Sequence, residues 1–555
     1  MSVKQKLELT WVGKGDEPQI EPRILLRDKT KEYGDPNNEN MLIHGDNLLA
    51  LKALEQKFAG KIKCIYIDPP YNTGSAFEHY DDNLEHSTWL SLMAPRLKIL
   101  RNLLREDGFI IIHIDETENA YLKVLCDEIF GRKNYVNTIT VRDSHPSGLK
   151  LASKEKTIIK TKSHMIIYKK SVEAMLNPIY QKRDKWDNHF GSYINIDDEK
   201  LLKQPLREVL IEKKIISNEG INESIIQNKK FREFVFANKD KIFQSTKEIP
   251  EFAKQQSLEN PDKVIEYSHN EQRNFAFNGR RLSPLSKSLQ DVGLEGSYCL
   301  DFAKLLCDFW DDIDFNNSQN EGGVLFPASK KPEYLVARIF TMFSSKHDLV
   351  LDSFLGSGTT AAVAHKMGRR WIGIELGDHC YTHCIPRMEK VILGEQGGIS
   401  KAVNWRGGGG FQFYELAPTL IERDRFGVEV ISGKYDGTML AMAVARLQGF
   451  VFQQREDRPY IHGVNNLNNG YIYVTTAFVT ETLLNEISRH FSREESLLIC
   501  ANAFELGLKS TRPNIKLKKI PECILRKCEY GVDNYNLNII DLSKFDEEDG
   551  NEWDE

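Results

Sequence analysis

Short apolar runs recur along the chain, and stretches with helical spacing of apolar residues separate them. The runs are rich in Ile, Val and Leu and are typical of buried strands; they lie at 41–44, 64–67, 109–112, 349–351 and 371–374. The stretches at 48–58 and 89–104 carry apolar residues at helical spacing. Short strands that alternate with such helices predict an α/β fold built on a parallel sheet.

One apolar run, Cys64-Ile65-Tyr66-Ile67, ends in Asp68-Pro69-Pro70-Tyr71. Neither proline nitrogen can donate a hydrogen bond, so the chain must leave the sheet there as a fixed loop. The loop places a carboxylate, a free carbonyl and an aromatic ring at the carboxyl end of a strand. Open α/β sheets bind their ligands in the crevice at that end.

These groups suit the exocyclic amino group of a base. Asp68 can accept one amino hydrogen and the Pro69 carbonyl the other, which directs the nitrogen lone pair towards an electrophile. Tyr71 can stack on a base that has been taken out of its helix. Because Asp-Pro-Pro is also ordinary turn chemistry, the motif alone leaves a plain turn equally open.

A glycine-rich turn supplies the context for this loop. Residues 348–376 read DLVLDSFLGSGTTAAVAHKMGRRWIGIEL, which predicts a strand, a tight loop at Gly356-Ser357-Gly358, a helix from Thr359 and a second strand that ends at Glu375. Glycines let the backbone approach a ligand, and a helix start favours negative charge. An acid about 20 residues beyond such a turn can accept hydrogen bonds from ribose hydroxyls.

Taken together, these motifs resemble the amino-group DNA methyltransferases that use S-adenosylmethionine. DPPY precedes SFLGSGTT here, and that order marks the beta class. The resemblance is to the modification subunits of Type III restriction-modification systems, and it rests on GDNLLALKAL, GKIKCIYIDPPYNTG, WLSLMAPRLKILRNLLREDGFIIIHIDETE, KKPEYL and LDSFLGSGTT. It covers roughly residues 40–145 and 325–390 and implies a Rossmann-like methyltransferase sheet.

The resemblance also implies which residues form the site. The catalytic residues would be Asp68, Pro69, Pro70 and Tyr71. The residues that bind S-adenosylmethionine would be Asp46, Asp68, Lys331, Pro332, Asp352, Phe354, Gly356, Ser357, Gly358, Thr359, Thr360 and Glu375. Asp46 can instead act only as the cap of the helix 48–58. No metal is expected, since a sulfonium is already a good electrophile.

Several functions remain open at this point. Asp68 favours adenine, because the family more often shows Ser-Pro-Pro-Tyr for cytosine; cytosine amino methylation and, more weakly, an RNA substrate are the alternatives. A DNA-binding subunit without activity is disfavoured by the intact motifs. A complete restriction enzyme is disfavoured because the sequence has no GxxxxGK[ST] phosphate loop. The resemblance implies double-stranded DNA and a restriction or helicase subunit as partners, and a homodimeric state. An orphan methyltransferase without a restriction partner is the alternative.

Composition divides the chain into segments. From about residue 134 to 320 it becomes rich in Lys, Asn, Gln and Ser, which predicts an inserted target-recognition domain; a structural or oligomerisation domain is the alternative. A run of lysines there can be a solvated face or a DNA-backbone contact, and its members are Lys150, Lys154, Lys156, Lys160, Lys162, Lys169 and Lys170. The expected boundaries are an N-terminal arm (1–40), the catalytic half of the core (41–145), the insert (146–324), the cofactor half (325–395), a small α/β C-terminal domain (411–545) and an acidic tail (546–555).

Two clusters suggest metal ligands, but ordinary helices explain both. Asp115-Glu116-Thr117-Glu118 is typical of an acidic first helical turn. His379-Cys380 and His383-Cys384 have i,i+4 spacing, yet no second ligand cluster accompanies them.

Bulk properties set limits on the rest. The 555 residues are 41% hydrophobic and 28% charged, as in an ordinary globular protein. The net charge of −6 means that any contact with DNA must come from local basic patches. Nine scattered cysteines suggest reduced thiols in a cytoplasmic chain, and neither a signal peptide nor a membrane span is expected.

Overall fold

The computed structural model of the protein describes residues 8–15, 20–71, 82–145, 154–197, 200–217, 221–269, 271–295, 297–315, 318–326, 330–423, 425–455, 457–465, 467–508 and 512–520. The chain divides into two compact units: Met1–Asn177 with Asp308–Glu555, and Pro178–Cys307. The first unit contains the central sheet and the C-terminal domain, and the second contains two smaller sheets.

The central sheet of the described residues has eleven strands in the order β1-β20-β3-β19-β18-β4-β5-β7-β6-β17, with β2 beside β20. The strands are β1 Leu25–Arg27, β2 Tyr33–Gly34, β3 Met41–His44, β4 Ile62–Ile67, β5 Leu104–Ile114, β6 Tyr135–Arg142, β7 Lys162–Lys169, β17 Phe309–Trp310, β18 Leu349–Asp352, β19 Arg370–Glu375 and β20 Gly410–Leu416. The five strands β3, β19, β18, β4 and β5 are parallel. All six residues of β4 are buried, which explains its nearly continuous apolar sequence.

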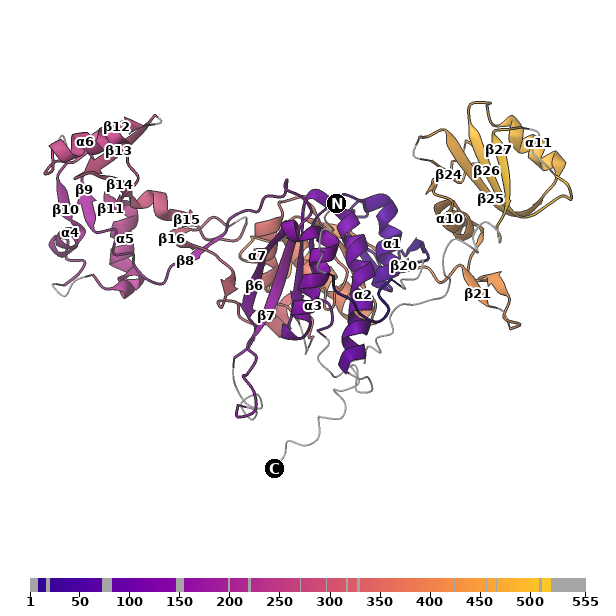
Figure 1. Ribbon diagram of the computed structural model, residues 1–555, viewed down its shortest axis with the longest axis horizontal. Coiled ribbons are helices and arrows are strands. Elements are labelled where there is room, and N and C mark those ends of the chain that lie inside the picture. Colours follow the sequence, from indigo (N-terminus) through magenta and orange to yellow (C-terminus); the bar gives the residue numbers. More distant parts are fainter. Residues whose placement is uncertain are drawn as a thin grey trace, which may run out of the picture. The chain divides into compact units, whose positions relative to one another are not determined.

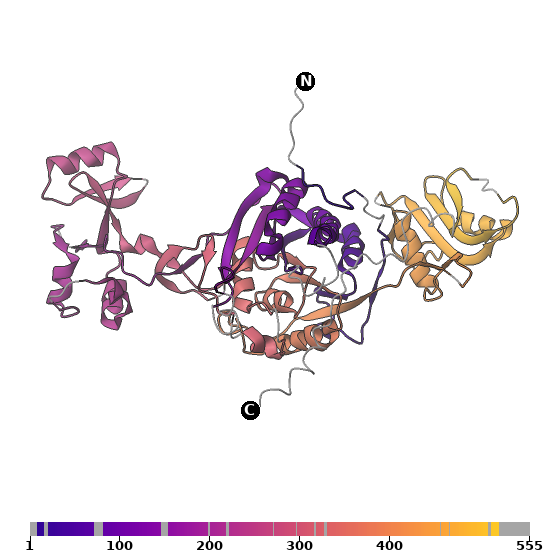
Figure 2. The ribbon, with the colours of Figure 1, turned by 60° about the horizontal axis from the view of Figure 1, so that its bottom comes forward.

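Two groups of helices cover the sheet (Figures 1 and 2). One group is α1 Asn47–Phe58, α2 Asp82–Leu103 and α3 Glu116–Cys126, and the other is α7 Glu333–Phe343, α8 Thr359–Lys366 and α9 Ile385–Ile392. The apolar residues of α2 that were expected at helical spacing, such as Met93, Leu97 and Leu100, pack with Ile65 and Ile110 in the main core. The parallel strands at the centre of this mixed sheet, together with the helices that cover them, confirm the Rossmann-like α/β fold.

The strand β7 lies antiparallel between β5 and β6. The compact second unit, 178–307, is therefore shorter than the expected insert 146–324, because part of that stretch belongs to the central sheet. Strand pairing is a contact between residues distant in the sequence. The sequence of the lysine-flanked run 165–168 therefore does not indicate that this strand pairs with β5.

The second unit has its own apolar core, with Trp186, Phe190, Phe231 and Phe302 at its centre. Its sheets have the orders β10-β9-β11-β14-β13-β12 and β15-β16-β8. Its strands are β8 Tyr180–Lys182, β9 Ser192–Ile194, β10 Lys203–Pro205, β11 Ile242–Thr246, β12 Ile265–His269, β13 Gln272–Phe277, β14 Arg280–Pro284, β15 Leu289–Asp291 and β16 Leu300–Leu305. Its helices are α4 Leu206–Glu212, α5 Lys229–Ala237 and α6 Glu251–Glu259.

The C-terminal domain is a five-stranded sheet in the order β23-β24-β25-β26-β27, preceded by a two-stranded sheet. Its elements are β21 Ile421–Arg423, β22 Glu429–Ile431, α10 Gly437–Leu447, β23 Val451–Phe452, β24 Gly463–Val464, β25 Gly470–Val479, α11 Glu481–Arg489, β26 Ser496–Phe504 and β27 Ile515–Lys519. Thr480 caps α11, since its hydroxyl accepts a hydrogen bond from the Leu483 amide. The last part of the expected C-terminal domain, 521–545, and the acidic tail, 546–555, lie outside the described residues.

No helix among the described residues is both long enough and apolar enough to cross a membrane.

Candidate active site

Four neighbouring strands bring the expected acidic residues to one edge of the sheet. The parallel strands β4, β18, β19 and β3 lie side by side in that order, and their carboxyl ends meet at the same edge. Asp68 follows β4, Asp352 ends β18, Glu375 ends β19 and Asp46 follows β3. The fold therefore places the DPPY loop next to the glycine loop, although the two are far apart in the sequence.

Both carboxylate oxygens of Asp68 have partners. The Tyr71 hydroxyl donates a hydrogen bond to Asp68 Oδ1 at 2.8 Å, and Lys331 Nζ lies 2.7 Å from Asp68 Oδ2. The same ammonium lies 5.0 Å from the centroid of the Tyr71 ring. Trp89 Nε1 donates to the Pro70 carbonyl at 2.8 Å. The loop is thus fixed by a cation, an aromatic hydroxyl and an indole, none of which uses the Pro69 carbonyl.

Beneath the Tyr71 ring lies a buried histidine, His113, whose ring centroid is 6.3 Å away. The hydrogen bonds of His113 join Nδ1 to the Tyr66 hydroxyl at 3.0 Å and Nε2 to Ser163 Oγ at 2.7 Å. Burial, together with the nearby charge of Lys331, lowers the pKa of His113 well below its usual value. The His113 ring is therefore uncharged at neutral pH.

The glycine loop has the backbone that its sequence predicts. Gly356 and Gly358 have φ of +56° and +79°, a region that other residues rarely adopt. The Gly356 amide donates to Glu375 Oε2 at 2.6 Å, which links the loop to the end of β19. A Cβ on Gly356 would meet no described atom within 4 Å, so its outer side faces open space.

A cluster of fully buried charges supports the loop from behind. Glu333, the first residue of α7, accepts from Lys366 Nζ at 2.7 Å and from Arg387 Nη2 at 2.8 Å. Arg387 Nη1 in turn donates to the Ser357 carbonyl at 3.2 Å and to Thr359 Oγ1 at 2.7 Å. The start of α7, which follows Lys331, is thereby tied to the glycine loop.

Asp352 is a buried carboxyl between two other acids. Burial raises its pKa to about 7, and the charges of Asp68 and Glu375 act in the same direction. Asp352 Oδ1 also accepts from the Phe354 amide at 2.9 Å. A buried carboxyl with a raised pKa at a strand end is a site where a bound cation would be stabilised.

Asp46 has the capping role that was expected as one of its two roles. Its side chain accepts from the Leu49 amide at 3.0 Å, and Arg96 Nη2 lies 3.3 Å from its Oδ2. Both side chains are buried. Whether Asp46 also contacts a cofactor stays a prediction.

The remaining expected cofactor residues lie around the same edge. Pro332 precedes α7, Ser357 belongs to the glycine loop, and Thr360 lies in the first turn of α8. The sequence did not indicate Trp89 or Arg387, because their apolar or helical surroundings look like ordinary core. It also missed Ser353, whose buried Oγ has no hydrogen-bond partner among the described residues.

Residues of both clusters that resemble metal sites have structural roles. Asp115 caps α3 through the Thr117 amide at 2.8 Å, as expected for an acidic helix start. His379 Nε2 lies 2.9 Å from Glu375 Oε1, and Cys384 Sγ lies 3.1 Å from the Gly356 carbonyl. Within the described part of the chain, no group of three or more His, Cys, Asp or Glu residues could hold a metal ion.

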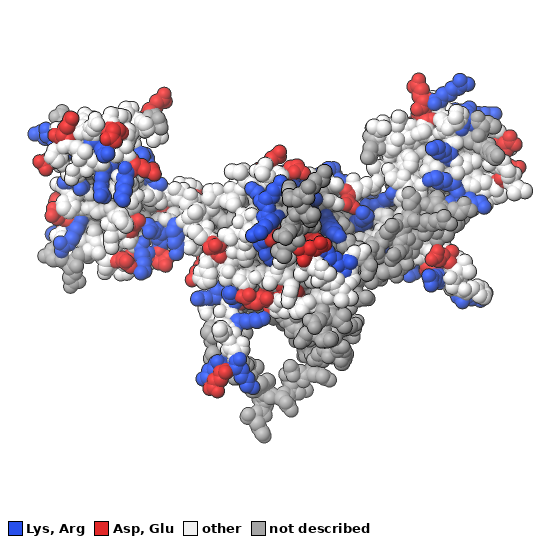
Figure 3. Space-filling view, viewed as in Figure 1, with Lys and Arg blue, Asp and Glu red and all other residues white. Residues whose placement is uncertain are grey.

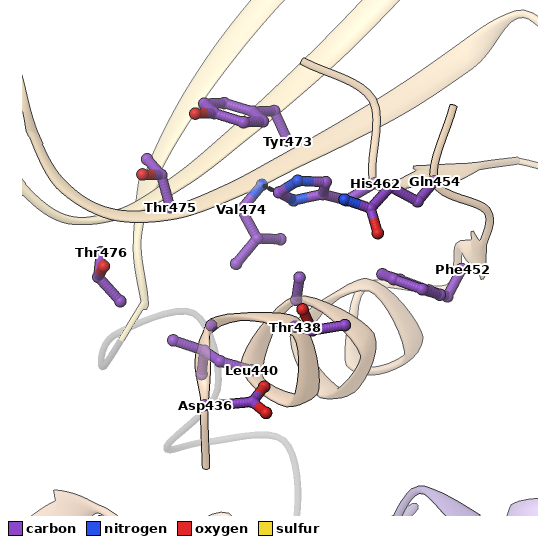
Figure 4. Close-up of a pocket in the computed structure, with 12 residues that line it drawn as sticks. Asp436, Thr438, Leu440, Phe452, Gln454, His462, Tyr473, Val474, Thr475 and Thr476 are labelled. Carbon is purple, nitrogen blue, oxygen red and sulfur yellow. Dashed lines mark hydrogen bonds between the residues drawn. The ribbon is translucent and has the colours of Figure 1, made fainter. Parts of the chain in front are cut away.

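A hollow of about 350 Å³ lies in the C-terminal domain (Figure 4). It is lined by Asp436, which caps α10, by Thr438 in the first turn of that helix, and by β25 from Tyr473 to Thr476. His462 also lines it, and its Nδ1 accepts from the Val474 amide at 3.2 Å. None of the residues that line this hollow belongs to the DPPY loop or the glycine loop.

A family model described as DNA methylase matches residues 62–384, which is more than half of the chain. The chain belongs to the DNA methylase family. The matched range includes the DPPY loop, the glycine loop and Glu375, whereas β3 and Asp46 precede it.

Individual relatives agree with this membership. The chain is 37% identical over 408 residues to a probable Type III restriction-modification enzyme HindVI Mod subunit of Haemophilus influenzae, covering 68% of this chain and 54% of that protein. It is 34% identical over 213 residues to the EcoP15I Mod subunit of Escherichia coli, covering 31% and 32%. The chain thus spans about half the length, or less, of these relatives.

Among solved structures, a putative DNA modification methylase of Thermus thermophilus complexed with S-adenosyl-L-methionine is 15% identical, with a TM-score of 0.32. That match covers 67% of this chain and 99% of the other.

Proposed function

We propose that the protein transfers a methyl group from S-adenosylmethionine to the exocyclic amino nitrogen of adenine in double-stranded DNA. The observation that carries this proposal is the position of Asp68 and the Pro69 carbonyl next to the glycine loop and Glu375, at the ends of neighbouring strands. Family membership and the likeness to Mod subunits support it.

The residues present fit this cofactor. Open space lies beyond Gly356, the buried Ser353 hydroxyl has no partner among the described residues, and Asp352 is placed to favour a cation. The glycine loop and Glu375 would hold the cofactor through backbone amides and ribose hydroxyls. S-adenosylmethionine supplies a methyl group on a sulfonium, which leaves as a neutral thioether.

The protein itself would mainly position the base. Tyr71 would stack on the flipped adenine, while Asp68 and the Pro69 carbonyl accept the two amino hydrogens. These hydrogen bonds direct the nitrogen lone pair and stabilise the positive charge that develops on nitrogen as the N–C bond forms. The methylated nitrogen would then lose one proton to solvent water. Lys331 and the Tyr71 hydroxyl hold Asp68 in the orientation that this requires.

The names of the relatives support a role as the modification subunit of a Type III-like restriction or defence system. On that basis we propose a restriction subunit as a partner and a homodimer as the state of this chain. Light scattering of the purified protein, alone and with the candidate partner, measures both.

Sequencing of methylated bases in DNA from cells with and without the protein tests the function. We expect N6-methyladenine at one sequence, present only with the protein and lost with Asp68→Ala. Calorimetry should show that Asp68→Ala still binds S-adenosylmethionine, because Asp68 lies on a different loop from Gly356. Unchanged methylation by this variant would contradict the assignment.

A further inference from the structure

The connection between β6 and β7 leaves the sheet at the edge where Asp68 lies. β4 and β5 pair Ile67 with Ile112, β5 and β7 pair Ile114 with His164, and β6 and β7 pair Arg142 with Lys162. Each step follows the same edge. We call the described residues of this connection, 143–145 and 154–161, the β6–β7 arm; it extends beyond the sheet in Figure 1.

The root of this arm lies near the Tyr71 ring. Burial and Asp68 raise the pKa of Tyr71 most, and the charge of Asp143, the first residue of the arm, adds to the rise. Strands lie about 4.8 Å apart, so β7, two strands from β4, is about 10 Å away. The four residues from Lys162 back to Ile158 can span about 13 Å. The arm can therefore reach a duplex whose target base is held at Tyr71.

The outer part of the arm is basic and exposed. Lys154, Lys156 and Lys160 are exposed, with Glu155 as the acidic residue among them. Figure 3 shows lysine or arginine side chains on this protrusion. At its root, Lys160 lies 3.6 Å from Asp115, whereas no ion pair of Lys154 or Lys156 is found among the described residues. Such lysines fit the phosphates of a nucleic acid.

An apolar side chain, Ile158, lies between Lys156 and Lys160. Ile158 is 93% exposed, close to complete exposure. Single exposed apolar residues are common on protein surfaces, so the exposure alone does not indicate a partner. The position of Ile158 is what matters, because it lies on a basic arm that starts beside the site proposed to hold an extruded base.

We propose that the β6–β7 arm binds the DNA duplex, with Lys154 and Lys156 on the phosphates and Ile158 inserted into the base stack next to the target adenine. This inference rests on the proposed function. Extrusion of a base costs stacking energy and leaves a gap. Isoleucine is one of the side chains that proteins insert between base steps. By filling the gap, Ile158 stabilises the duplex from which the base has left.

Methyl transfer by Ile158→Ala tests the insertion. The substrates are two duplexes that carry the methylated sequence found by sequencing, one with the target adenine paired to thymine and one with an abasic site opposite it. We expect the single-turnover rate to fall about tenfold on the paired duplex and less than twofold on the other, where extrusion is easier. Ile158→Leu should keep the wild-type rate on both. Val172→Ala, at a 77% exposed residue beyond the other end of β7, is the control and should change neither rate.

The two rates decide whether Ile158 inserts into the base stack. An equal loss on both duplexes would assign Ile158 to general binding or folding and overturn the insertion, as would no loss on either. Binding to the paired duplex at several salt concentrations tests the arm without requiring catalysis. Lys154→Gln with Lys156→Gln should reduce the slope of log K against log[salt] by about 2, since each phosphate contact contributes about 0.9. An unchanged slope overturns the arm as a DNA contact, whereas absence of methyl transfer by the wild-type protein contradicts the proposed function instead.

Discussion

The ammonium of Lys331 lies 2.7 Å from Asp68 Oδ2, and both side chains are mostly buried, with 13% and 19% of their surface exposed. The resemblance had placed Lys331 only with the cofactor residues. Its contact with the carboxylate that we propose to be catalytic gives it a second expected role, which is to hold Asp68 in a fixed orientation. Because α7 is tied to the glycine loop through Glu333 and Arg387, this lysine lies between the two halves of the site.

We predict that Lys331→Met lowers the single-turnover rate of methyl transfer at least tenfold, because Asp68 loses the cation that orients it. The affinity for S-adenosylmethionine should fall less than the rate does. Stopped-flow transfer and calorimetry measure the two quantities. Lys401→Met, at an exposed lysine of the same unit, is the control and should change neither. A normal rate with much weaker cofactor binding would restrict Lys331 to the cofactor.

The strand ends of this site could be predicted because their signals are local. The prolines after Ile67 force the chain out of β4, and the glycines at 356 and 358 adopt the positive φ that the loop needs. Because the strands are parallel, their carboxyl ends share one edge of the sheet, but the strand order that makes Asp68, Asp352 and Glu375 neighbours comes from the structure.

Contacts between distant residues could not be predicted in the same way. The ion pair between Lys331 and Asp68 depends on how α7 packs, and Trp89 appeared as one more apolar residue of a helix although its indole holds the Pro70 carbonyl. The position of β7 in the central sheet has the same cause, since an isolated apolar run does not identify its partner strand.

We predict that Gly356→Val weakens the binding of S-adenosylmethionine at least tenfold. The valine would be strained at φ +56° and would fill the open space in front of the loop. Gly507→Val is a matched control, because Gly507 has φ +77° and equally open surroundings in the C-terminal domain. The free energy of unfolding should fall by a similar amount, about 1–2 kcal/mol, in both variants. Equal cofactor affinity in the two folded variants would exclude the loop as the cofactor site.

We predict that Asp352→Asn increases the stability of the cofactor-free protein at pH 8 but not at pH 4. Burial raises the pKa of Asp352 from 3.8 to about 7, so the native state binds more protons than the unfolded state between these values. Stability that depends on this proton is present below pH 4 and is lost as the pH rises through 7. A tenfold difference in acid dissociation constant between the folded and unfolded states corresponds to roughly 1.4 kcal/mol. Urea titrations of both proteins from pH 4 to 8 measure the difference, and parallel curves would contradict it.

The same variant should bind S-adenosylmethionine more weakly at pH 8, because the ionised Asp352 would face the cofactor's positive charge. Wild-type affinity for the cofactor should therefore rise with pH through about 7, whereas that of Asp352→Asn should change little. Calorimetry across this range separates the two. A pH-independent wild-type affinity would show that Asp352 does not interact with the cation.

The unit Pro178–Cys307 is our candidate for sequence recognition, because it leaves the central unit after β7 and returns before β17. Not all of its basic residues are available to DNA. Arg232 pairs with Asp301 at 2.8 Å, and Arg273 pairs with Glu266 at 2.8 Å, so these two arginines already have acidic partners. Others, such as Lys203 and Lys230, are exposed and can contact phosphates. Polar side chains of the same unit would then contact the base edges and read the sequence.

We predict that exchanging residues 178–307 for the matching segment of a related methyltransferase moves the methylated sequence to that of the donor. The exchange leaves the β6–β7 arm, the DPPY loop and the glycine loop with the host, so the transfer rate should stay within about tenfold of wild type. Sequencing of methylated bases in cells that express the chimera measures the site. If the host site persists, the unit is structural or serves oligomerisation, and a second exchange of residues 421–520 then tests the C-terminal domain. A site that follows that second exchange would place recognition there, since the unit Pro178–Cys307 and the C-terminal domain each have a core of their own.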